Sequence, residues 1–170
     1  MGFSIELAEN RDAPVIREVY DQAIQHANSV GMIDWPSPFP ENTIKNFCIS
    51  NELFVVRADD AEQGIVAAFR LTEEPNPRIW DDPIKALYIG KVAVGDQARG
   101  MNLFYGDVLP YVYKIATQSS IEEIRLDCLA DNQRLRNFYT RHFEYMGDNK
   151  LMSQFGDELE VSKFSARINV

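Results

Sequence analysis

Two polar segments of the chain carry residue types that could bind and transform a ligand. The first is a short turn over residues 95–102 (GDQARGMN), which joins an apolar run at 86–94 to a predicted helix. A strand that enters a helix through a glycine-containing turn leaves backbone N–H groups without intrahelical partners, and these groups attract phosphate. The turn has neither the Gly-x-Gly-x-x-Gly pattern of a dinucleotide site nor the Gly-Lys-Ser/Thr of a Walker loop. Alone, it indicates only a generic phosphate site.

The second segment, residues 125–147, places Asn132 and Tyr139 on one predicted helix. Seven residues make about two turns with only about 20° of drift, so the two side chains share a face. A tyrosine with an ordinary pKa near 10 is protonated at neutral pH and can donate a proton to a leaving group. Asn132 offers a donor and an acceptor near the helix start. Taken alone, Tyr139 is more often a half-buried aromatic residue than an acid.

Composition narrows the class of protein. The chain has 170 residues, 45% of them hydrophobic, and we expect one globular domain over residues 1–170. Its net charge of −9 argues against broad binding to nucleic acid or anionic membrane, and is weakly compatible with a cationic partner such as an amine. No apolar run reaches the roughly 20 residues of a membrane span, and the N-terminus lacks a signal-peptide pattern, so we expect a cytoplasmic protein. With two cysteines and two histidines, not clustered, no metal site is expected.

Hydrophobic periodicity and turn residues predict the order of elements. Strands are expected at 3–7, 52–58, 65–71, 84–94, 121–130, 143–147 and 159–168. Helices are expected at 41–49, 100–118 and 131–141, and a first helix follows a cap at Asn10 or Asp12 and ends near residues 28–31. Gly106 and Pro110 lie inside the third helix and predict a kink or break there. Consecutive middle strands favour antiparallel pairing, whereas the two later strand–helix units favour at least one parallel pair. The fold class is therefore α/β (α+β): a mixed, mostly antiparallel sheet with helices on both faces.

The loop at 35–40 (WPSPFP) cannot form a regular helix or a central strand because its alternate prolines lack donors. Two interpretations of its aromatic residues remain open. Trp35 and Phe39 either fix the loop to the body of the protein or form the wall of a binding cleft for a substrate.

Together, these segments resemble the GCN5-related N-acetyltransferase (GNAT) superfamily over nearly the whole chain. Val92-Ala93-Val94 is followed by Gln97-Ala98-Arg99-Gly100-Met101-Asn102, which matches the family's Gln/Arg-x-x-Gly-x-Gly/Ala loop at Gln97 and Gly100. Arg125-Leu126-Asp127-Cys128 is followed by Asn132, Phe138 and Tyr139, as in the family's later motif. The loop containing Trp35 and Phe39 is similar to the acceptor-side segment of one bacterial branch.

The resemblance implies the acyl-CoA N-acyltransferase fold, with a splayed parallel pair of strands and acetyl-CoA as cofactor. Backbone at Val92, Ala93 and Val94 would pair with the pantetheine arm and the thioester. Backbone amides from Ala98 to Leu103 would bind the pyrophosphate. With Gln97 of the loop motif, the implied cofactor-binding residues of this segment are Gln97, Ala98, Arg99, Gly100, Met101, Asn102 and Leu103. Asn132 would contact the cofactor arm, and Tyr139 would protonate the CoA thiolate.

Three residues depart from the family pattern. Asn102 replaces the final small residue of the loop, so its side chain must turn away or contact the cofactor itself. Gly90 stands where many relatives place a polar residue that points into the site. His142 occupies the usual glycine of the turn after the tyrosine helix, where a positive φ would be tolerated. The general base is therefore unassigned: Glu73, Glu74, a water relay or no base at all.

The resemblance implies an acetyl-CoA-dependent N-acetyltransferase that acetylates a primary amine, of a small molecule or a peptide N-terminus, by direct attack in a ternary complex. The alternative is a non-catalytic acyl-CoA-binding or regulatory domain on the same fold. An interaction module without cofactor is disfavoured because both cofactor motifs are retained. A homodimer is suggested only by analogy with such families.

Overall fold

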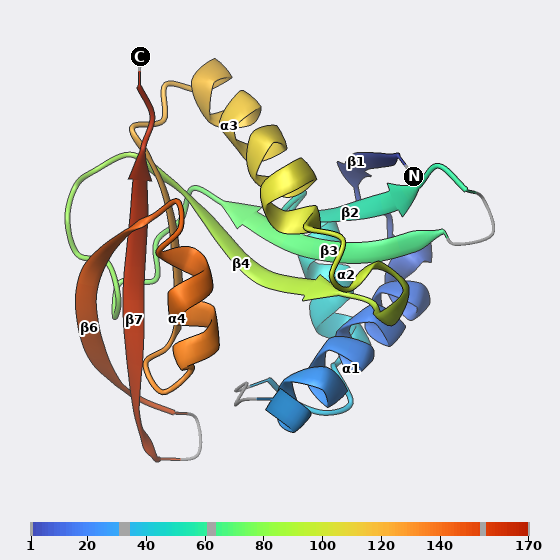
Figure 1. Cartoon of the computed structure of the whole chain (residues 1–170), viewed down its shortest axis with the longest axis horizontal. Helices are drawn as coiled ribbons and strands as arrows, with labels where there is room; N and C mark the ends of the chain where they lie inside the picture. The colour runs from blue at the N-terminus through green and yellow to red at the C-terminus, as the bar shows by residue number, and fades with distance from the viewer. Residues whose placement is uncertain (1, 31–34, 61–63, 154–155, 170) are drawn as a thin grey trace.

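The computed structural model describes residues 2–30, 35–60, 64–153 and 156–169. It forms a mixed α/β structure (Figure 1). The strands are β1 (Phe3–Leu7), β2 (Leu53–Ala58), β3 (Ile65–Thr72), β4 (Ala86–Val94), β5 (Glu123–Leu129), β6 (Glu144–Met152) and β7 (Glu158–Arg167). The α-helices are α1 (Ala13–Val30), α2 (Glu41–Ile49), α3 (Leu109–Gln118) and α4 (Gln133–Tyr139). No helix in the described ranges is both long and apolar enough to cross a membrane.

The strands form one seven-stranded sheet in the order β1-β2-β3-β4-β5-β7-β6. All neighbouring pairs are antiparallel except β4 and β5, which confirms the predicted mixed sheet with one parallel pair. This pair is short, because only Ala86–Tyr88 face Glu123–Arg125 in register. Beyond Tyr88 the two strands are no longer paired. Figure 1 shows β4 running away from the part of the sheet that contains β7. The sheet therefore opens at its centre, which confirms the expected splay.

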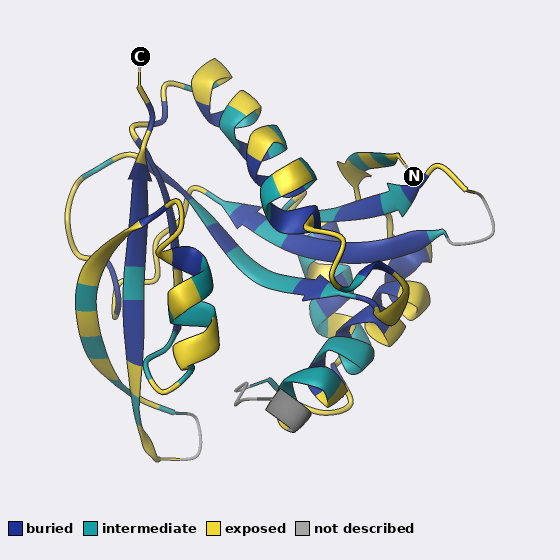
Figure 2. Cartoon of the chain, viewed as in Figure 1, coloured by how far each residue is buried: buried dark blue, intermediate teal, exposed yellow. Residues whose placement is uncertain are grey.

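Helices cover both faces of the sheet, as predicted. One core joins α1 and α2 to the sheet through residues such as Ile16, Ile44 and Val55. The other joins α3 and α4 to the opposite face through residues such as Val112 and Phe164. Figure 2 shows the buried residues along the central strands and the inner sides of the helices. Burial on both faces explains why β3 is almost continuously apolar.

The helix after the polar turn begins later than predicted. Residues 104–108 form a π-helical turn that runs directly into α3, so the predicted start at Gly100 was wrong. Pro110 lies in the first turn of α3, where its missing N–H is tolerated. The N–H of Leu109 instead reaches back to the carbonyl of Phe104. The expected irregularity near Gly106 is thus a π turn rather than a kink or break.

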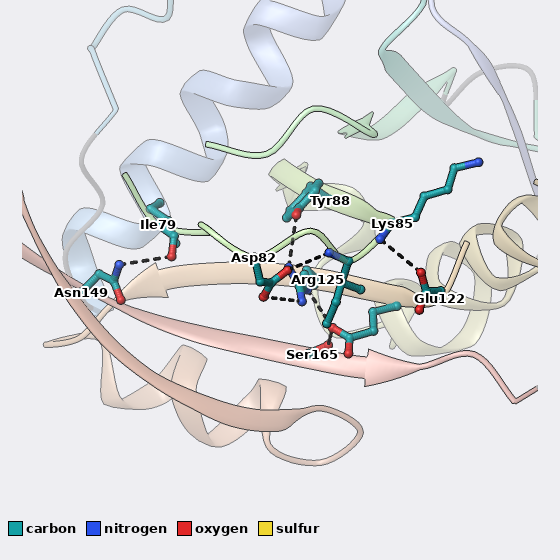
Figure 3. A network of polar contacts seen from close by, with 10 residues as sticks. Ile79, Asp82, Lys85, Tyr88, Glu122, Arg125, Asn149 and Ser165 are labelled. Atoms are coloured by element: carbon teal, nitrogen blue, oxygen red, sulfur yellow. Dashed lines mark hydrogen bonds and ion pairs between the residues drawn. The ribbon is translucent and has the colours of Figure 1, made fainter. Parts of the chain in front are cut away.

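The connection between β3 and β4 is held to the sheet by an ion network centred on the buried Arg125 (Figure 3). Arg125 is 1% exposed, and its two terminal nitrogens donate to the Asp82 carboxylate at 2.9 Å each. Its Nε donates to Glu123 at 2.7 Å, and Ser165 also donates to that carboxylate. The sequence pattern placed Arg125 on the polar side of an alternating strand. It is buried because this connection covers that side.

Candidate functional site

A cavity of about 1070 Å³ occupies the gap between the diverging strands β4 and β5. On one face of the sheet it is lined by Leu103, Phe138 and Tyr139, which belong to the layer of α3 and α4. On the other face it is lined by residues such as Trp35 and Trp80, from the loop before α2 and the β3–β4 connection. The cavity therefore gives access to the centre of the sheet from both sides.

The predicted phosphate loop forms the end of this cavity beside α3. A single 3₁₀ turn, Asp96–Ala98, follows Gly95, and the N–H of Asp96 donates to Gln22 of α1 at 3.0 Å. The amide of Ala98 donates to the carbonyl of Gly95, and the amide of Met101 donates to that of Ala98. These two of the predicted phosphate-binding amides are therefore engaged within the loop. The amides at the start of the helix, from Leu103 onward, point out of its first turn.

Asn102 owes its place in the loop to backbone conformation. Its φ is +56°, in the left-handed region that asparagine adopts more readily than other non-glycine residues. Gly100 has a φ of +83°, so the loop contains two left-handed residues around Met101. The side chain of Asn102 extends toward Gly106, where an added Cβ would lie 3.7 Å from its Nδ2. Asn102 thus adopts the left-handed conformation that a glycine would adopt at this position of the loop. His142, in contrast, does not have a positive φ.

A β-bulge in β4 shapes the middle of the cavity. Ala68 pairs with Ala93 and Arg70 pairs with Gly90, so Lys91 and Val92 together face one residue of β3. Lys91 has a φ of +49°, and the buried Tyr20 hydroxyl donates to its carbonyl at 2.7 Å. An added Cβ at Gly90 would meet no atom within 4 Å. The strand therefore offers open space at Gly90 and no side chain there.

Asn132 and Tyr139 lie at opposite ends of α4. Asn132 is the N-cap, not a residue within the helix, and its Oδ1 accepts the N–H of Leu135 at 3.1 Å. Tyr139 is the last helical residue and is buried among aromatic rings, including Phe104 and Phe164. Burial, followed by the nearby Cys128 and Asp127, raises the pKa of Tyr139 above its ordinary value. Its phenol is therefore protonated at neutral pH, and both residues line the cavity.

Asp127 also lines the cavity, and the sequence interpretation did not single it out. Successive residues of a strand point to opposite faces, so Asp127 and Cys128 lie on different sides of β5. Cys128 belongs to the core that contains Tyr139, whereas Asp127 shares the face of Arg125. Desolvation by the cavity walls raises the pKa of Asp127 to about 6, although nearby Lys91 opposes the shift. A carboxylate with this pKa can accept protons near neutral pH.

Positive charge gathers where the loop, α1 and α4 meet. Arg99 and Arg134 both line the cavity, and the Arg99 guanidinium donates to Asp96 at 2.6 Å. Desolvation, followed by the positive charges of Arg99 and Arg134, lowers the pKa of His26. Because this pKa already starts near 6.5, the His26 imidazole is mainly neutral at pH 7. The cavity therefore has a cationic end on an acidic protein.

The remaining predicted residues divide between the cavity wall and its surroundings. Trp35 lines the cavity, and the Lys91 ammonium lies 5.2 Å from the centre of its ring. Phe39 is 2% exposed and stacks on Tyr20 at 4.4 Å, so it lies behind the wall rather than in it. Glu74 lines the cavity whereas Glu73 does not. The predicted cofactor residues in the wall are Val92, Val94, Ala98, Arg99, Gly100, Asn102, Leu103 and Asn132, whereas Ala93, Gln97 and Met101 lie outside it.

The described residues contain no group of three or more His, Cys, Asp or Glu side chains that could hold a metal ion. The cavity wall offers backbone amides, cations, a phenol and a carboxylate. These groups are suited to binding an anionic ligand and to moving protons on either side of the sheet.

Comparison with known proteins identifies the fold. An acetyltransferase of the GNAT family from Listeria monocytogenes superposes with a TM-score of 0.76 at 19% identity, over 97% of this chain and 94% of that one. The ribosomal-protein-S5-alanine acetyltransferase from Vibrio fischeri gives 0.72 at 15% identity, over 99% and 94%. The protein yncA from Salmonella typhimurium, solved with its cofactor acetyl-CoA, gives 0.70 at 12% identity, over 100% and 96%.

No family model matches the chain, and no curated protein matches it in sequence. The structural similarities nevertheless extend over nearly the whole length of each partner. The chain therefore has the GNAT acyl-CoA N-acyltransferase fold.

Proposed function

We propose that the chain, as one domain over residues 1–170, is an acetyl-CoA-dependent N-acetyltransferase. It would acetylate a primary amine, of a small molecule or a peptide N-terminus, by direct attack in a ternary complex. The observation that carries this proposal is the cavity through the splayed strands, with Asp127 on one side of the sheet and Tyr139 on the other. The shared fold supports it, as does the acetyl-CoA bound to a protein of that fold.

The cavity has the groups that acetyl-CoA requires. Its cationic end, with Arg99 and Arg134, suits a ligand that carries several phosphate charges. The helix start beside Leu103 provides outward amides for a pyrophosphate. Beyond Tyr88 the edge of β4 no longer pairs with β5, so backbone at Val92 is available to an extended arm, while the Val94 carbonyl accepts a hydrogen bond from Arg99 at 3.4 Å. When bound, acetyl-CoA supplies an acyl group that is activated for transfer to nitrogen.

Asp127 and Tyr139 would handle protons on opposite sides of the splay. The Asp127 carboxylate accepts a proton from the acceptor ammonium and so exposes the nitrogen lone pair. The Tyr139 phenol donates its proton to the departing thiolate, which keeps the charge of the leaving group from accumulating. The acceptor amine would therefore lie on the Asp127 side of the sheet, and the departing thiol on the Tyr139 side.

The proposed transfer balances in atoms and charge. The bond from the acetyl carbon to sulfur breaks, and a bond from that carbon to the amine nitrogen forms. Both protons that leave the ammonium nitrogen pass to solvent, the first of them through Asp127, while Tyr139 gives its proton to sulfur. Tyr139 is then reprotonated from solvent. The products are an amide and free thiol.

The alternative, a non-catalytic acyl-CoA-binding domain, would be favoured by a missing base, by Asn102 in the loop and by an irregular helix after it. Asp127 provides a candidate base at the cavity wall, with a pKa matched to the task. Glu74 reaches the same cavity from the connection after β3, whereas Asp127 lies on β5 at the point where the strands separate. We therefore propose Asp127 as the base in preference to Glu74 or a water relay.

Two measurements test this function in order. Calorimetric titration with acetyl-CoA should give saturable 1:1 binding that weakens in Arg134→Gln but not in Arg11→Gln, an exposed arginine outside the cavity. Thiol release should then depend on an added primary amine. Binding without amine-dependent release would favour the non-catalytic alternative, and absence of binding would reject the cofactor.

A further inference from the structure

We propose that the acceptor is a small primary amine with an aromatic or bulky apolar body and no anionic group. This inference rests on the proposed function and concerns the half of the cavity on the α1 side of the sheet. We call this half the acceptor groove. It lies between Trp35 and the β3–β4 connection, and it contains Glu74 and Asp127.

The floor and far wall of the acceptor groove are apolar. Ile79, Trp80 and Val161 form a buried cluster, with Tyr88, Leu129 and Leu151 packed against it. Several strands contribute, because Val161 of β7 lies opposite Leu129 of β5 and Asn149 of β6. The apolar members that line the cavity are Ile79, Trp80, Tyr88, Leu129, Leu151, Leu159 and Val161. Such a surface favours a flat or branched hydrocarbon body.

This wall is held in place before a ligand arrives. Asn149 of β6 donates from its amide nitrogen to the carbonyls of Arg78 and Ile79, at 3.1 Å each. Asp82 is held by Arg125 (Figure 3). The Arg125 guanidinium also lies 4.4 Å from the centre of the Trp80 ring. The connection is thus fixed to the sheet at two places on either side of Trp80. A preformed wall lowers the ordering cost of binding.

The charges of the groove favour a cation over a zwitterion. Arg70 is paired with Glu52, with Nη2 at 2.6 Å from the carboxylate, and its guanidinium also lies over the Phe47 ring. Lys91 lies at Trp35 and acts electrostatically on Asp127. A third cation, Lys163, lies opposite Asp127 in the β5–β7 register, with its ammonium 5.4 Å from the centre of the Trp80 ring, and it acts electrostatically on Asp82. Each of these three cations already interacts with a carboxylate, whereas no side chain among the described residues forms an ion pair with Glu74. An ammonium is therefore attracted by Glu74 and Asp127, and the same two carboxylates repel a substrate carboxylate.

The tryptophans offer a direct readout of this site. The chain has two, and both Trp35 and Trp80 line the acceptor groove. Intrinsic fluorescence should therefore change when an amine occupies it, without any need for turnover. We would titrate the full chain, with and without saturating CoA, using phenethylamine, ethylamine and phenylalanine. These share a primary amine and differ in the ring and the carboxylate.

We expect phenethylamine to bind about 10- to 100-fold more tightly than ethylamine, because the ring enters the apolar wall. Phenylalanine should bind about tenfold more weakly than phenethylamine, because Asp127 and Glu74 repel its carboxylate. Equal affinities for phenethylamine and ethylamine would overturn the proposal, as would tighter binding of phenylalanine. Preference for a peptide with an apolar first residue over phenethylamine would also overturn it.

A matched pair of variants in β6 locates the binding site. Leu151 lines the groove and is half-buried, whereas its neighbour Met152 is 59% exposed and lies outside the cavity. Leu151→Ser should weaken phenethylamine binding about tenfold, and Met152→Ser should leave it unchanged. Neither should alter calorimetric binding of acetyl-CoA. Equal effects of the two substitutions would refute the proposed site. If the unmodified chain did not bind acetyl-CoA at all, the proposed function would be refuted instead.

Discussion

Arg125 and Tyr88 face each other across the last register pair of the parallel strands, and Arg125 Nη1 donates to the Tyr88 hydroxyl at 3.3 Å. The strands separate immediately beyond this pair. The same guanidinium binds Glu123 within β5 and Asp82 in the β3–β4 connection. One buried cation therefore joins three segments at the point where the cavity opens.

Replacing Arg125 by methionine should destabilise the fold strongly. The substitution keeps much of the side-chain volume but leaves Glu123, which is 7% exposed, without its cation. Removing one partner of a buried ion pair costs about 3–5 kcal/mol, and urea denaturation would measure the loss. Lys150→Met is the control, because Lys150 and Glu158 form an exposed pair at 3.3 Å. Similar losses of about 1 kcal/mol or less in both variants would contradict a structural role for the network.

The left-handed conformation of Asn102 makes a second prediction. Asn102→Gly should retain the loop, whereas Asn102→Val should strain it by about 1–2 kcal/mol and weaken acetyl-CoA binding measured by calorimetry. Ser120→Val is the matched control, because Ser120 has a φ of +55° just beyond the end of α3. It should lose similar stability without a change in affinity. Equal loss of affinity in both valine variants would show that the effect is not local to the loop.

Tyr139→Phe tests the proposed acid. The ring should keep its contacts with Phe104 and Phe164, so the melting temperature and the acetyl-CoA affinity should stay close to the original. The turnover number should fall about 10²- to 10⁴-fold, the range for loss of a positioned acid. Tyr145→Phe is the control, because this exposed tyrosine donates to Asp148 at 2.7 Å outside the cavity. Unchanged turnover in Tyr139→Phe would remove the acid from the mechanism.

Local patterns were sufficient to predict much of the fold. Residues 41–49 form α2 within the predicted bounds, because Ile44 and Cys48 lie one helical turn apart and are both buried. The splay and the mixed sheet followed from the resemblance and the order of elements. The π turn did not, because Gly106 and Pro110 indicate an irregularity but do not specify how the hydrogen bonds are rearranged around it.

The acceptor side could not be predicted in the same way. The polar, proline-containing stretch that holds Trp80 and Asp82 has no periodicity, and its role depends on contact with Arg125, 43 residues later in sequence. The sequence pattern did not identify Asp127 as a site residue for a related reason. On an alternating strand it resembles a solvent-facing residue, and only the separation of β4 from β5 turns that face into a cavity wall. Its position two residues after Arg125, on the same face, was the available signal.

Asp127 gives the pH dependence that would identify the base. Because its pKa is raised to about 6, kcat/KM for the amine should increase as the pH rises through about 6 and then level off. Asp127→Asn should lower kcat/KM and abolish this limb while leaving acetyl-CoA binding intact. Glu74→Gln should retain the limb, because Glu74 lines the same cavity but is not the proposed base. A limb that persists in Asp127→Asn would assign it to another group.

The same carboxylate should cost the protein stability, and the sign follows from the direction of its pKa shift. Desolvation raises the folded-state pKa of Asp127 from its ordinary 3.8 to about 6, so the folded state binds the proton more tightly than the unfolded state. The stabilising contribution of this proton is complete below pH 3.8 and is lost as the pH rises through about 6. The stability difference between Asp127→Asn and the original chain should therefore favour the variant more at pH 8 than at pH 4, as measured by thermal unfolding. A variant that gains stability while losing its amine-dependent rate would mark Asp127 as a residue retained for chemistry, whereas a loss of stability at pH 8 would mark it as a structural partner of Lys91.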